Sequence, residues 1–573
     1  MDREEIKSTP VWQLYEKGQN YHRRTGIYTD TDRNYRFYNG NQWEGANLGD
    51  VEPVQKNFIK PIVKYKQAVI HDNLYGIVYS SMNYENPLFR KTAEKCCELL
   101  NGYVARLWEQ DKMDYKLRRV TKDAAINDEG IFYVYWDEEQ KRPVHEIIKK
   151  NDIYYGNEDD DDIQNQPYIL IRKRMPVSNA MDLALREGAS EEDLRYIIGD
   201  NDTSEKTGED AKEEVDDQVT VIYKLYKQNG TVKFSVATRY VTISENVDMG
   251  IKLYPVAHMV WEEKEGSARG EGEVRYLIPN QIEVNRTEMR RVLTVKMQAY
   301  PTKIADTSKI ANPDALDRVG VTIKTFGQTV DDVKKVVGVI PPAQMSQDVI
   351  KLQEDLINVT RDLAGAGDTA TGQVNPESAS GRAILAVQQA SQAPMTEQKE
   401  STKNLVEDVA RIDLEYIIVH SEEGLKMVDT ATDPRSGQEV QKMVTVPQSV
   451  LQQLQATVKI DITPKGVYDR FAQEQTIENL LTQGFFNSQR VSELEIYYKV
   501  LPDDSVAPKV MIGEAIEYTK EEQRKIAAIQ AQAQAMQQRA NQFLMGDMDE
   551  QSSMMADAQR QLRARQGLQL VKQ

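Results

Sequence analysis

The sequence predicts an α+β protein that is mainly helical, and three observations support this fold class. Apolar residues recur three and four positions apart through long stretches, as is typical of amphipathic helices. Alternating apolar residues on both sides of Asn229-Gly230, within residues 218–240, predict a β-hairpin. The chain has 573 residues, which is too many for one hydrophobic core, so we expect several subdomains.

The N-terminal half begins with helices and continues with strands. Residues 10–40 and 57–110 have helical apolar spacing, and residues 116–129 predict a further helix. Besides the hairpin, strands are expected at "GIFYVYWD", "PYILIRKRM" and "YPVAHMVWE". Cys96 and Cys97 are neighbours on a predicted helix, where adjacent side chains diverge, so we interpret them as unpaired core thiols.

Two helices with narrow apolar seams follow, separated by a short mixed segment with strand-like "GVTIKTF" and "VKKVVGVI". The first seam, in a helix ended by Pro301, consists of Ile282, Asn285, Met289, Val292 and Lys296. The second consists of Val349, Leu352, Leu356, Val359 and Leu363. A stripe of this width suits a helix packed between two neighbouring subunits, and a core helix of a monomer is the alternative interpretation.

A loop crowded with Gly, Ser, Thr and Ala, Leu363–Ile384, comes next. It is not a phosphate-binding loop, because no strand precedes it, no Gly-Lys dipeptide occurs, and Ala370 stands where a third glycine is needed. After it we expect one long helix that is kinked or broken at Pro394. The remaining predicted elements are a strand at 456–464, helices near 469–483 and 490–500, and a polar tail from Thr519 that is helical or disordered.

The distribution of charge and reactive groups argues against an enzyme. The net charge of −18 disfavours tight, static DNA binding by the whole surface. Residues 191–217 carry twelve acids and three bases, and Glu158–Asp162 is an acidic run; both are expected to be solvated loops. A calcium site is the alternative interpretation of the second run, although the run lacks the interleaved spacing and the glycine of an EF-hand loop. The five histidines form no HExxH motif, and no GxSxG motif occurs, so we expect no catalytic residues, no cofactor and no metal site.

Four short stretches, together with the order of elements, resemble the portal protein, or head-to-tail connector, of tailed bacteriophages. They are "RFYNGNQW", "KNFIKPIVKYKQAVI", "GEGEVRYLIPNQIEVNRTEMRRVLTVKMQAYP" with Gln281, Asn285 and Arg286, and "GQVNPESASGRAI". The resemblance covers nearly the whole chain in architecture. It implies an α/β wing, a two-helix stem, a small α/β clip and a helical crown or barrel. The implied boundaries are 1–276 (wing), 277–300 (first stem helix), 301–342 (clip), 343–364 (second stem helix), 365–382 (tunnel loop), 383–465 (kinked helix and return to the wing) and 466–573 (crown or barrel).

The resemblance implies a ring, typically a dodecamer, at one vertex of the capsid in the virion, assembled in the host cytoplasm. Double-stranded DNA passes through its tunnel during packaging and ejection. The implied partners are terminase, a tail adaptor or connector protein, the major capsid protein and a scaffolding protein, with no membrane. The packaging ATPase belongs to terminase, in agreement with the missing phosphate-binding motif. A mostly acidic wall would leave the DNA free to slide, because every basic contact adds affinity that movement must overcome.

Three groups of residues are the candidate functional residues under this interpretation. The DNA-facing tunnel loop would contribute Thr369, Thr371, Gln373, Asn375, Ser378, Ser380 and Arg382. Bases of the stem that face the tunnel or a subunit interface would be Arg286, Arg290, Arg291, Lys296 and Arg361. The docking surface of the clip would contain Lys303, Lys309 and Lys324. The alternatives are another oligomeric virion protein, such as a collar or tail component, and a nucleic-acid-processing enzyme.

Overall fold

The N-terminal part of the chain is a set of helices joined by tight turns. Helix α1 (Pro10–Thr25) is capped by the Thr9 hydroxyl, and Gly26, with a positive φ of 77°, ends α1 and allows α2 (Ile27–Asn39) to start at once. Helices α3 (Ile59–Ile70), α4 (Pro87–Gln110) and α5 (Met113–Ile126) follow. The expected helices are therefore confirmed, except that residues 73–81 form strand β1 (Asn73–Ser81) instead of continuing a helix.

The computed structural model describes most of the chain up to residue 464 and short pieces beyond it. The described ranges are 7–48, 51–81, 87–200, 217–299, 302–318, 321–326, 336–341, 345–367, 393–421, 425–432, 439–454 and 456–464, with helical pieces between 513 and 563. The chain divides by its contacts into two units, Met1–Thr463 and Pro464–Gln573. None of the described helices has the length and apolar character needed to cross a membrane.

Two antiparallel sheets form the centre of the first unit. One has the order β3-β2-β9, and the other has the order β4-β5-β6-β7-β8. The hairpin expected around Asn229-Gly230 is confirmed, since both residues have the positive φ that its turn requires. The strands are β2 (Glu129–Asp137), β3 (Arg142–Ile148), β4 (Ile153–Tyr155), β5 (Ile169–Pro176), β6 (Gln218–Gln228), β7 (Thr231–Ala237), β8 (Thr242–Asp248) and β9 (Val256–Val260). Short helical segments between them are η2 (Lys150–Asp152), η3 (Ile163–Asn165), α6 (Val177–Arg186) and α7 (Glu191–Leu194).

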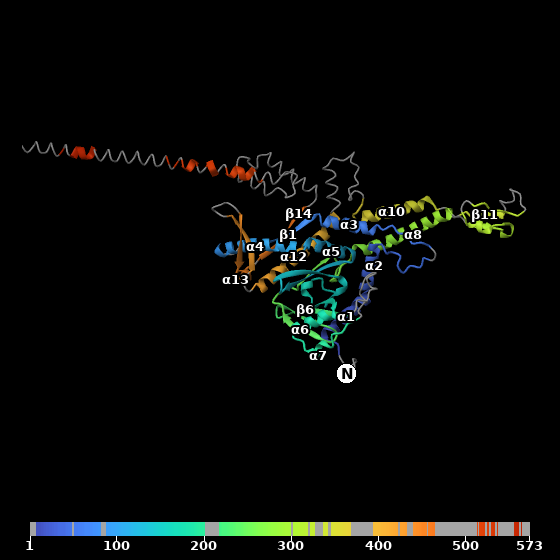
Figure 1. Ribbon diagram of the computed structural model, residues 1–573, viewed down its shortest axis with the longest axis horizontal. Helices are drawn as coiled ribbons and strands as arrows, with labels where there is room; N and C mark the ends of the chain where they lie inside the picture. The colour runs from blue at the N-terminus through green and yellow to red at the C-terminus, as the bar shows by residue number, and fades with distance from the viewer. Residues whose placement is uncertain are drawn as a thin grey trace, which may run out of the picture. The chain divides into compact units, whose positions relative to one another are not determined.

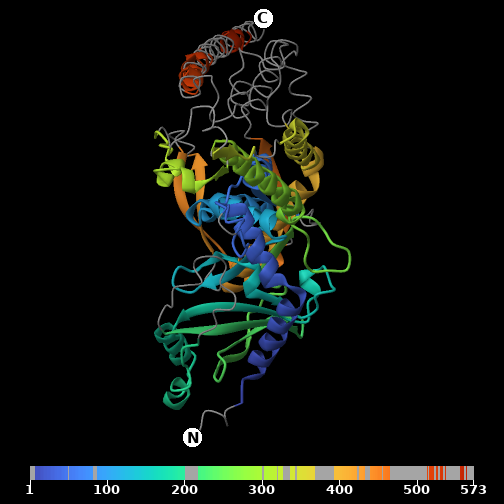
Figure 2. The same cartoon turned by 90° about the vertical axis from the view of Figure 1, so that its right-hand side faces the viewer.

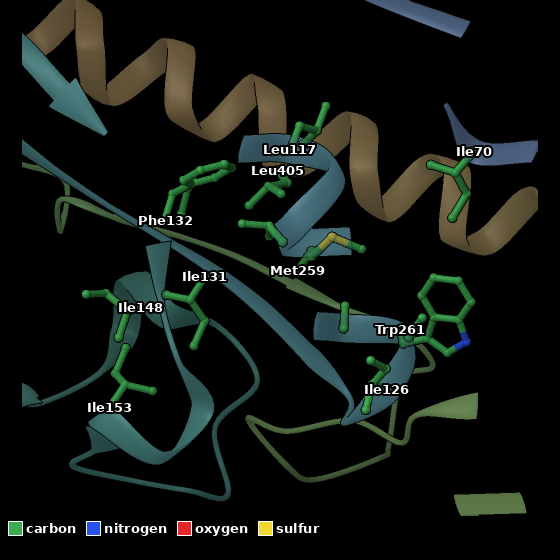
Figure 3. Close-up of a cluster of buried hydrophobic side chains, with 14 of the residues drawn as sticks. Ile70, Leu117, Ile126, Ile131, Phe132, Ile148, Ile153, Met259, Trp261 and Leu405 are labelled. Carbon is green, nitrogen blue, oxygen red and sulfur yellow. The ribbon is translucent and has the colours of Figure 1, made fainter. Parts of the chain in front are cut away.

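The main hydrophobic core lies where helices pack on the three-stranded sheet. Figure 3 shows Phe132 of β2, Met259 of β9 and Leu405 of α12 (Thr396–His420) around one space, and all three are at most 1% exposed. Helix α5 also packs closely on β2: a Cβ on Gly130 would lie 2.5 Å from Cγ1 of Val120. The tight fit explains a glycine inside the strand.

A long pair of helices, α8 (Glu273–Ala299) and α10 (Gln347–Leu363), extends from this body side by side toward strand β11 (Figures 1 and 2). Helix α8 starts at residue 273, four residues before the expected position. Its first turn follows Gly272, where a Cβ would lie 2.4 Å from the carbonyl oxygen of Asn127. Between the helices is a small module of β10 (Lys303–Ala305), η5 (Thr307–Lys309), η6 (Pro313–Asp317) and β11 (Val337–Val339). Strands β10 and β11 pair antiparallel, but "GVTIKTF" forms only an isolated bridge, at Thr325.

The end of the first unit combines one confirmed strand with two unexpected ones. Pro394 lies in the 3-10 turn η7 (Ala393–Met395), directly before α12. The first part of the expected long helix, before residue 393, lies outside the described residues, so the kink or break expected at Pro394 stays a prediction. Strand β14 (Ala456–Pro464) confirms the expected strand and pairs with β1. The unexpected pair is β12 (Leu425–Thr432) and β13 (Glu439–Val446), which is followed by α13 (Gln448–Gln453). The helices expected at 469–483 and 490–500 lie outside the described residues.

Candidate functional site

The contact between α8 and α10 includes buried polar side chains, although Leu356 and Ile357 on the same side of α10 are also partly buried. Nδ2 of Asn280 donates to Oγ1 of Thr360 at 2.9 Å, and Nε2 of Gln353 donates to Oε2 of Glu288 at 2.7 Å. Gln353 and Thr360 are each only 3% exposed. Buried polar groups with satisfied hydrogen bonds fix the register of two helices, because sliding one past the other would leave them unpaired.

One flank of α10, beside the face that contacts α8, is apolar and uncovered in the subunit. Leu352, Val359 and Leu363 are 65%, 52% and 83% exposed, whereas Leu356 of the same predicted seam is half-buried against the body. Helix α8 also exposes apolar side chains, namely Tyr276, Leu293, Val295 and Met297. Apolar side chains gathered on one uncovered flank of a helix pair form the kind of surface that is typical of contacts with another chain.

The seam predicted on α8 faces the loop after α2 at two of its positions. Nδ2 of Asn285 donates to Oε1 of Gln42 at 2.5 Å, and Nζ of Lys296 lies 2.6 Å from Oε2 of Glu52. Next to Asn285, the amide of Gln281 accepts from the backbone N–H of Phe58 at 3.0 Å and donates to the carbonyl of Lys56 at 2.9 Å. Gln281 and Asn285 are at most 2% exposed. They act as a polar clamp between α8 and the loop.

The basic residues predicted on the helix pair are mostly held in exposed ion pairs. Arg286 pairs with Glu283 at 2.6 Å, and Arg291 lies 3.9 Å from Glu288. Arg290 is exposed and has no carboxylate within 4 Å in the described part of the chain, and Arg361 is half-buried in the last turn of α10. Exposed pairs contribute little to stability, so these bases keep their charge available for a ligand or a neighbouring subunit.

The small β10–β11 module presents apolar side chains as well as the predicted lysines. Nζ of Lys303 donates to the carbonyl of Leu316, and Lys309 pairs with Asp306 at 3.2 Å, while Lys324 is exposed. Four apolar side chains of the module are between 47% and 63% exposed: Ile304, Phe326, Val339 and Ile340. The surface of the module is therefore apolar as well as basic, and its apolar part was not predicted from the sequence.

The predicted tunnel loop lies mostly outside the described residues. This holds for Thr369, Thr371, Gln373, Asn375, Ser378, Ser380 and Arg382. Its first residues are anchored, since the N–H of Ala366 donates to the carbonyl of Arg361 at 2.8 Å and Gly365 has a φ of 69°. The loop thus leaves α10 through a left-handed glycine, as helix ends often do.

A buried ion network around Arg269 holds the two sheets and the loop before α8 together. Its guanidinium pairs with Glu129 and, at 2.8 Å, with Glu158, and it donates to Nε2 of His22 at 3.0 Å. Burial and the nearby Arg269 lower the pKa of His22 to about 2, so this imidazole is neutral. The expectation that Glu158 belongs to a solvated run is wrong, because its side chain is 11% exposed and pairs with Arg269.

A second buried histidine is held in the opposite state. Nδ1 of His145 lies 2.9 Å from Oδ2 of Asp111, and Nε2 lies 3.0 Å from Oδ1 of Asp413. Burial alone would lower the pKa of His145, but the carboxylates of Asp413 and Asp111 outweigh it and raise the pKa to about 9. Since both ring nitrogens face carboxylates, both carry a proton and the imidazole is positively charged. The ion pairs of His145 therefore connect strand β3 to α12 and to the turn after α4.

Neither network has the features of a catalytic or metal site. Within the described residues, no group of three or more His, Cys, Asp or Glu side chains could hold a metal ion. Cys96 and Cys97 are buried, as expected, and burial raises the pKa of their thiols to about 12 and about 11, which makes them unreactive. The candidate site is therefore a set of binding surfaces: the helix pair, the small module and the loop that follows α10.

A family model described as "Phage P22-like portal protein" matches residues 18–569. No curated protein matches the chain.

Proposed function

The chain belongs to the phage P22-like portal protein family, and we propose that it forms a ring, a dodecamer by analogy with the family, at one vertex of the capsid. In this proposal the ring is a conduit for double-stranded DNA during packaging and ejection. It has no enzyme activity of its own, because terminase supplies the ATPase. The observation that carries the proposal is the uncovered apolar stripe of α10, formed by Leu352, Val359 and Leu363.

The arrangement of apolar residues suits a ring better than a two-fold dimer. Closed rings need heterologous interfaces, in which one surface of a subunit meets a different surface of the next. The helix pair offers two such surfaces, the stripe of α10 and the exposed Val295 and Met297 of α8. We propose that the stripe of one subunit packs on α8 of its neighbour, with α8 and α10 as the stem.

The other parts of the subunit are assigned from the same premise. The body before α8, together with α12 and the strands after it, is the wing, the β10–β11 module is the clip, and residues 466–573 are the crown or barrel. The loop of residues 365–382 faces DNA, with Arg290 and Arg361 as the stem bases nearest to that role. The clip docks terminase first and a tail adaptor later, using Ile304 and Phe326 beside Lys324. Contacts with the major capsid protein and a scaffolding protein, at the vertex and in the host cytoplasm during assembly, complete the proposal.

Native mass spectrometry of the purified protein tests the ring. A closed assembly near twelve subunits supports the proposal, and a protein that stays monomeric at every concentration contradicts it. The variant Leu363→Glu should lose the assembly while its subunit unfolds at an unchanged temperature, because Leu363 is 83% exposed. Leu185→Glu is the matched control, since Leu185 is an exposed leucine of α6 and its replacement should leave the ring intact.

A clip variant separates docking from assembly. Phe326→Ser removes an exposed aromatic side chain that has no role in ring closure under this proposal. We expect the ring to form normally and its affinity for terminase or the adaptor to fall at least about tenfold, as for a buried aromatic anchor. Unchanged affinity for both partners would assign the clip surface to another role.

A further inference from the structure

Helices α3 and α5 pack against each other and share one exposed face that is basic. Nε2 of Gln67 donates to the carbonyl of Arg118 at 2.6 Å, and Nε2 of His71 lies 2.6 Å from Oγ1 of Thr121. Leu117, Val120 and Ala124 of α5 point into the core, so the opposite side of the helix faces solvent. The basic side chains on this common face are Lys60 and Lys64 of α3 and Arg118, Arg119 and Lys122 of α5, which we call the α3–α5 basic face.

The positive charge of this face is unusual for the chain and is not held in close ion pairs. Residues 112–122 contain five basic residues and one acidic residue, in a protein with a net charge of −18. Among the described residues, no carboxylate lies within 4 Å of the five nitrogen-bearing side chains of the face. The nearest acids make hydrogen bonds to other groups: Asp114 accepts from Nε1 of Trp108 at 2.9 Å, and Asp123 accepts from the Tyr35 hydroxyl at 2.7 Å. Asp123 also interacts electrostatically with Lys122 and Arg119, so the face keeps a net positive charge from five bases against two acids.

The charges of the two helices are brought together by one aromatic ring. Nζ of Lys60 lies 5.7 Å from the centre of the Tyr38 ring, and Nζ of Lys122 lies 5.1 Å from it. Along each helix, Lys60 and Lys64, and likewise Arg118 and Lys122, are four residues apart, which is about 6 Å of helix. The result is a two-row array of cations rather than a single charged spot.

We propose that the α3–α5 basic face binds the phosphate backbone of double-stranded DNA without regard to sequence. Backbone binding requires an array of Lys and Arg side chains and no apolar anchor, because the affinity comes from the release of counterions. An acidic protein partner would need apolar or aromatic side chains at the centre of its interface, where lysine is depleted. Tyr115 is the one large apolar side chain exposed beside these bases on the described α5.

This site is separate from the conduit proposed above. The face belongs to one subunit and does not require a ring. DNA binding by this face can therefore be found even if the protein forms no ring, and it can be absent even if the ring forms. Five phosphate contacts predict a slope of log affinity against log salt of about −4.5. The binding is therefore weak at physiological salt and strong only when several copies act together.

Fluorescence anisotropy of the purified full-length protein with a short labelled duplex, over a series of salt concentrations, measures the binding. Replacing three bases, as in Arg118→Gln/Arg119→Gln/Lys122→Gln, should make the salt slope shallower by about 3 and weaken binding at low salt at least about tenfold. These side chains are exposed or partly exposed, so the variant should keep the unfolding temperature of the native protein.

The matched control carries the same change in net charge on the five-stranded sheet. Lys224→Gln/Lys233→Gln/Arg239→Gln should leave both affinity and slope nearly unchanged. An equal loss in the two triple variants would mean that net charge alone governs binding, and no loss in the α3–α5 variant would mean that DNA binds elsewhere; either result overturns the proposal.

A competition experiment distinguishes the alternative partner. Polyglutamate of similar charge carries carboxylates on a protein backbone, so it represents an acidic protein. We expect the duplex to displace bound labelled DNA at a lower concentration of charge than polyglutamate does. If polyglutamate is the better competitor, and only when the α3–α5 basic face is intact, the face is a site for an acidic protein and the DNA proposal is wrong.

Discussion

The body of the subunit and the α8–α10 pair are built on opposite principles. In the body, Leu405 is fully buried and the charged Arg269 is buried together with two carboxylates that pair with it. In the helix pair, Gln353 and Thr360 are inside, and Leu363, with 83% of its surface exposed, is outside. The body therefore buries its own apolar and charged groups, whereas the helix pair leaves an apolar flank uncovered, which a neighbouring subunit covers under the proposed function. Stability should therefore depend on the body and assembly on the pair.

The largest effect should come from breaking the buried ion network of the body. Arg269→Met leaves Glu129, which is fully buried, and Glu158 without their shared partner. We expect the free energy of unfolding to fall by about 4 kcal/mol, the typical cost of an uncompensated buried charge. Denaturant unfolding followed by circular dichroism measures this. Arg290→Met on the exposed side of α8 is the control and should change stability by less than about 0.5 kcal/mol; equal effects would remove the distinction between the two regions.

A matched pair of leucines tests the comparison directly. Leu405→Ala creates a cavity in the core and should cost about 3 kcal/mol of subunit stability. Leu363→Ala removes the same atoms from an exposed position and should leave subunit stability unchanged. When ring assembly is measured by native mass spectrometry instead, Leu363→Ala should reduce assembly more than Leu405→Ala does. If Leu363→Ala destabilises the isolated subunit as much as Leu405→Ala, the stripe belongs to a monomer core.

The two buried histidines of the body should give stability an optimum in pH. His145, whose pKa is raised to about 9, binds its proton more tightly in the folded state, so its contribution is complete below the unfolded pKa of about 6.5 and is lost as the pH rises through 9. The loss should be roughly 3 kcal/mol. His22, whose pKa is lowered to about 2, has the opposite sign, and its contribution falls as the pH drops below about 6.5.

Unfolding free energy measured across this pH range, in the native protein and in His145→Gln, checks the assignment. The variant should lose the decline between pH 6.5 and 9 and keep the decline at lower pH. Loss of the low-pH decline instead would mean that the charge states of His145 and His22 have been exchanged. The helix pair contains no histidine, so no variant of its polar contacts should alter this profile.

The smallest effect is expected at the polar clamp between the two regions. Gln281→Ala leaves the N–H of Phe58 and the carbonyl of Lys56 without their side-chain partners, which should cost about 1–2 kcal/mol. Hydrogen exchange should show faster exchange of the Phe58 amide, because the loop after α2 loosens from α8. Gln347→Ala, at the exposed start of α10, is the control. An unchanged Phe58 amide would show that the loop is held by other contacts.

The sequence predicted local features well where neighbouring residues determine them. The Asn229-Gly230 turn and the strand at 456–464 depend on the conformational preferences of a few residues, and both are confirmed. Strand β1 was missed because its apolar residues continue the pattern of α3 without a turn signal between them, and a short apolar run fits helix and strand equally well.

Contacts between distant residues could not be predicted in the same way. The spacing of Leu352, Val359 and Leu363 indicated a narrow stripe, but spacing does not tell whether a stripe faces the subunit's own core or a neighbour. Arg269 and Glu129 are 140 positions apart, so nothing near either residue in the sequence marks the pair. Gln281 was noted only for its resemblance to a family motif, and Asn285 for that resemblance and for its place in a helical seam. Their hydrogen bonds to the loop supply the physical reason for those residue types.

The tight fit at Gly272 fixes one end of α8, so a small rotation there would move the far end of the helix by a larger distance. The root of the helix is fixed by Gly272 against Asn127, by the 2.5 Å ion pair of Glu273 with Lys66, and by Gln281 and Asn285. Beyond Asn285 about 20 Å of helix remains, so a rotation of about 5° at the root moves the far end by about 2 Å. A small repacking at the start of α8 would thus produce a larger shift of the β10–β11 module. A partner that docks on that module, as proposed above, would in turn act on the packing around Gly272.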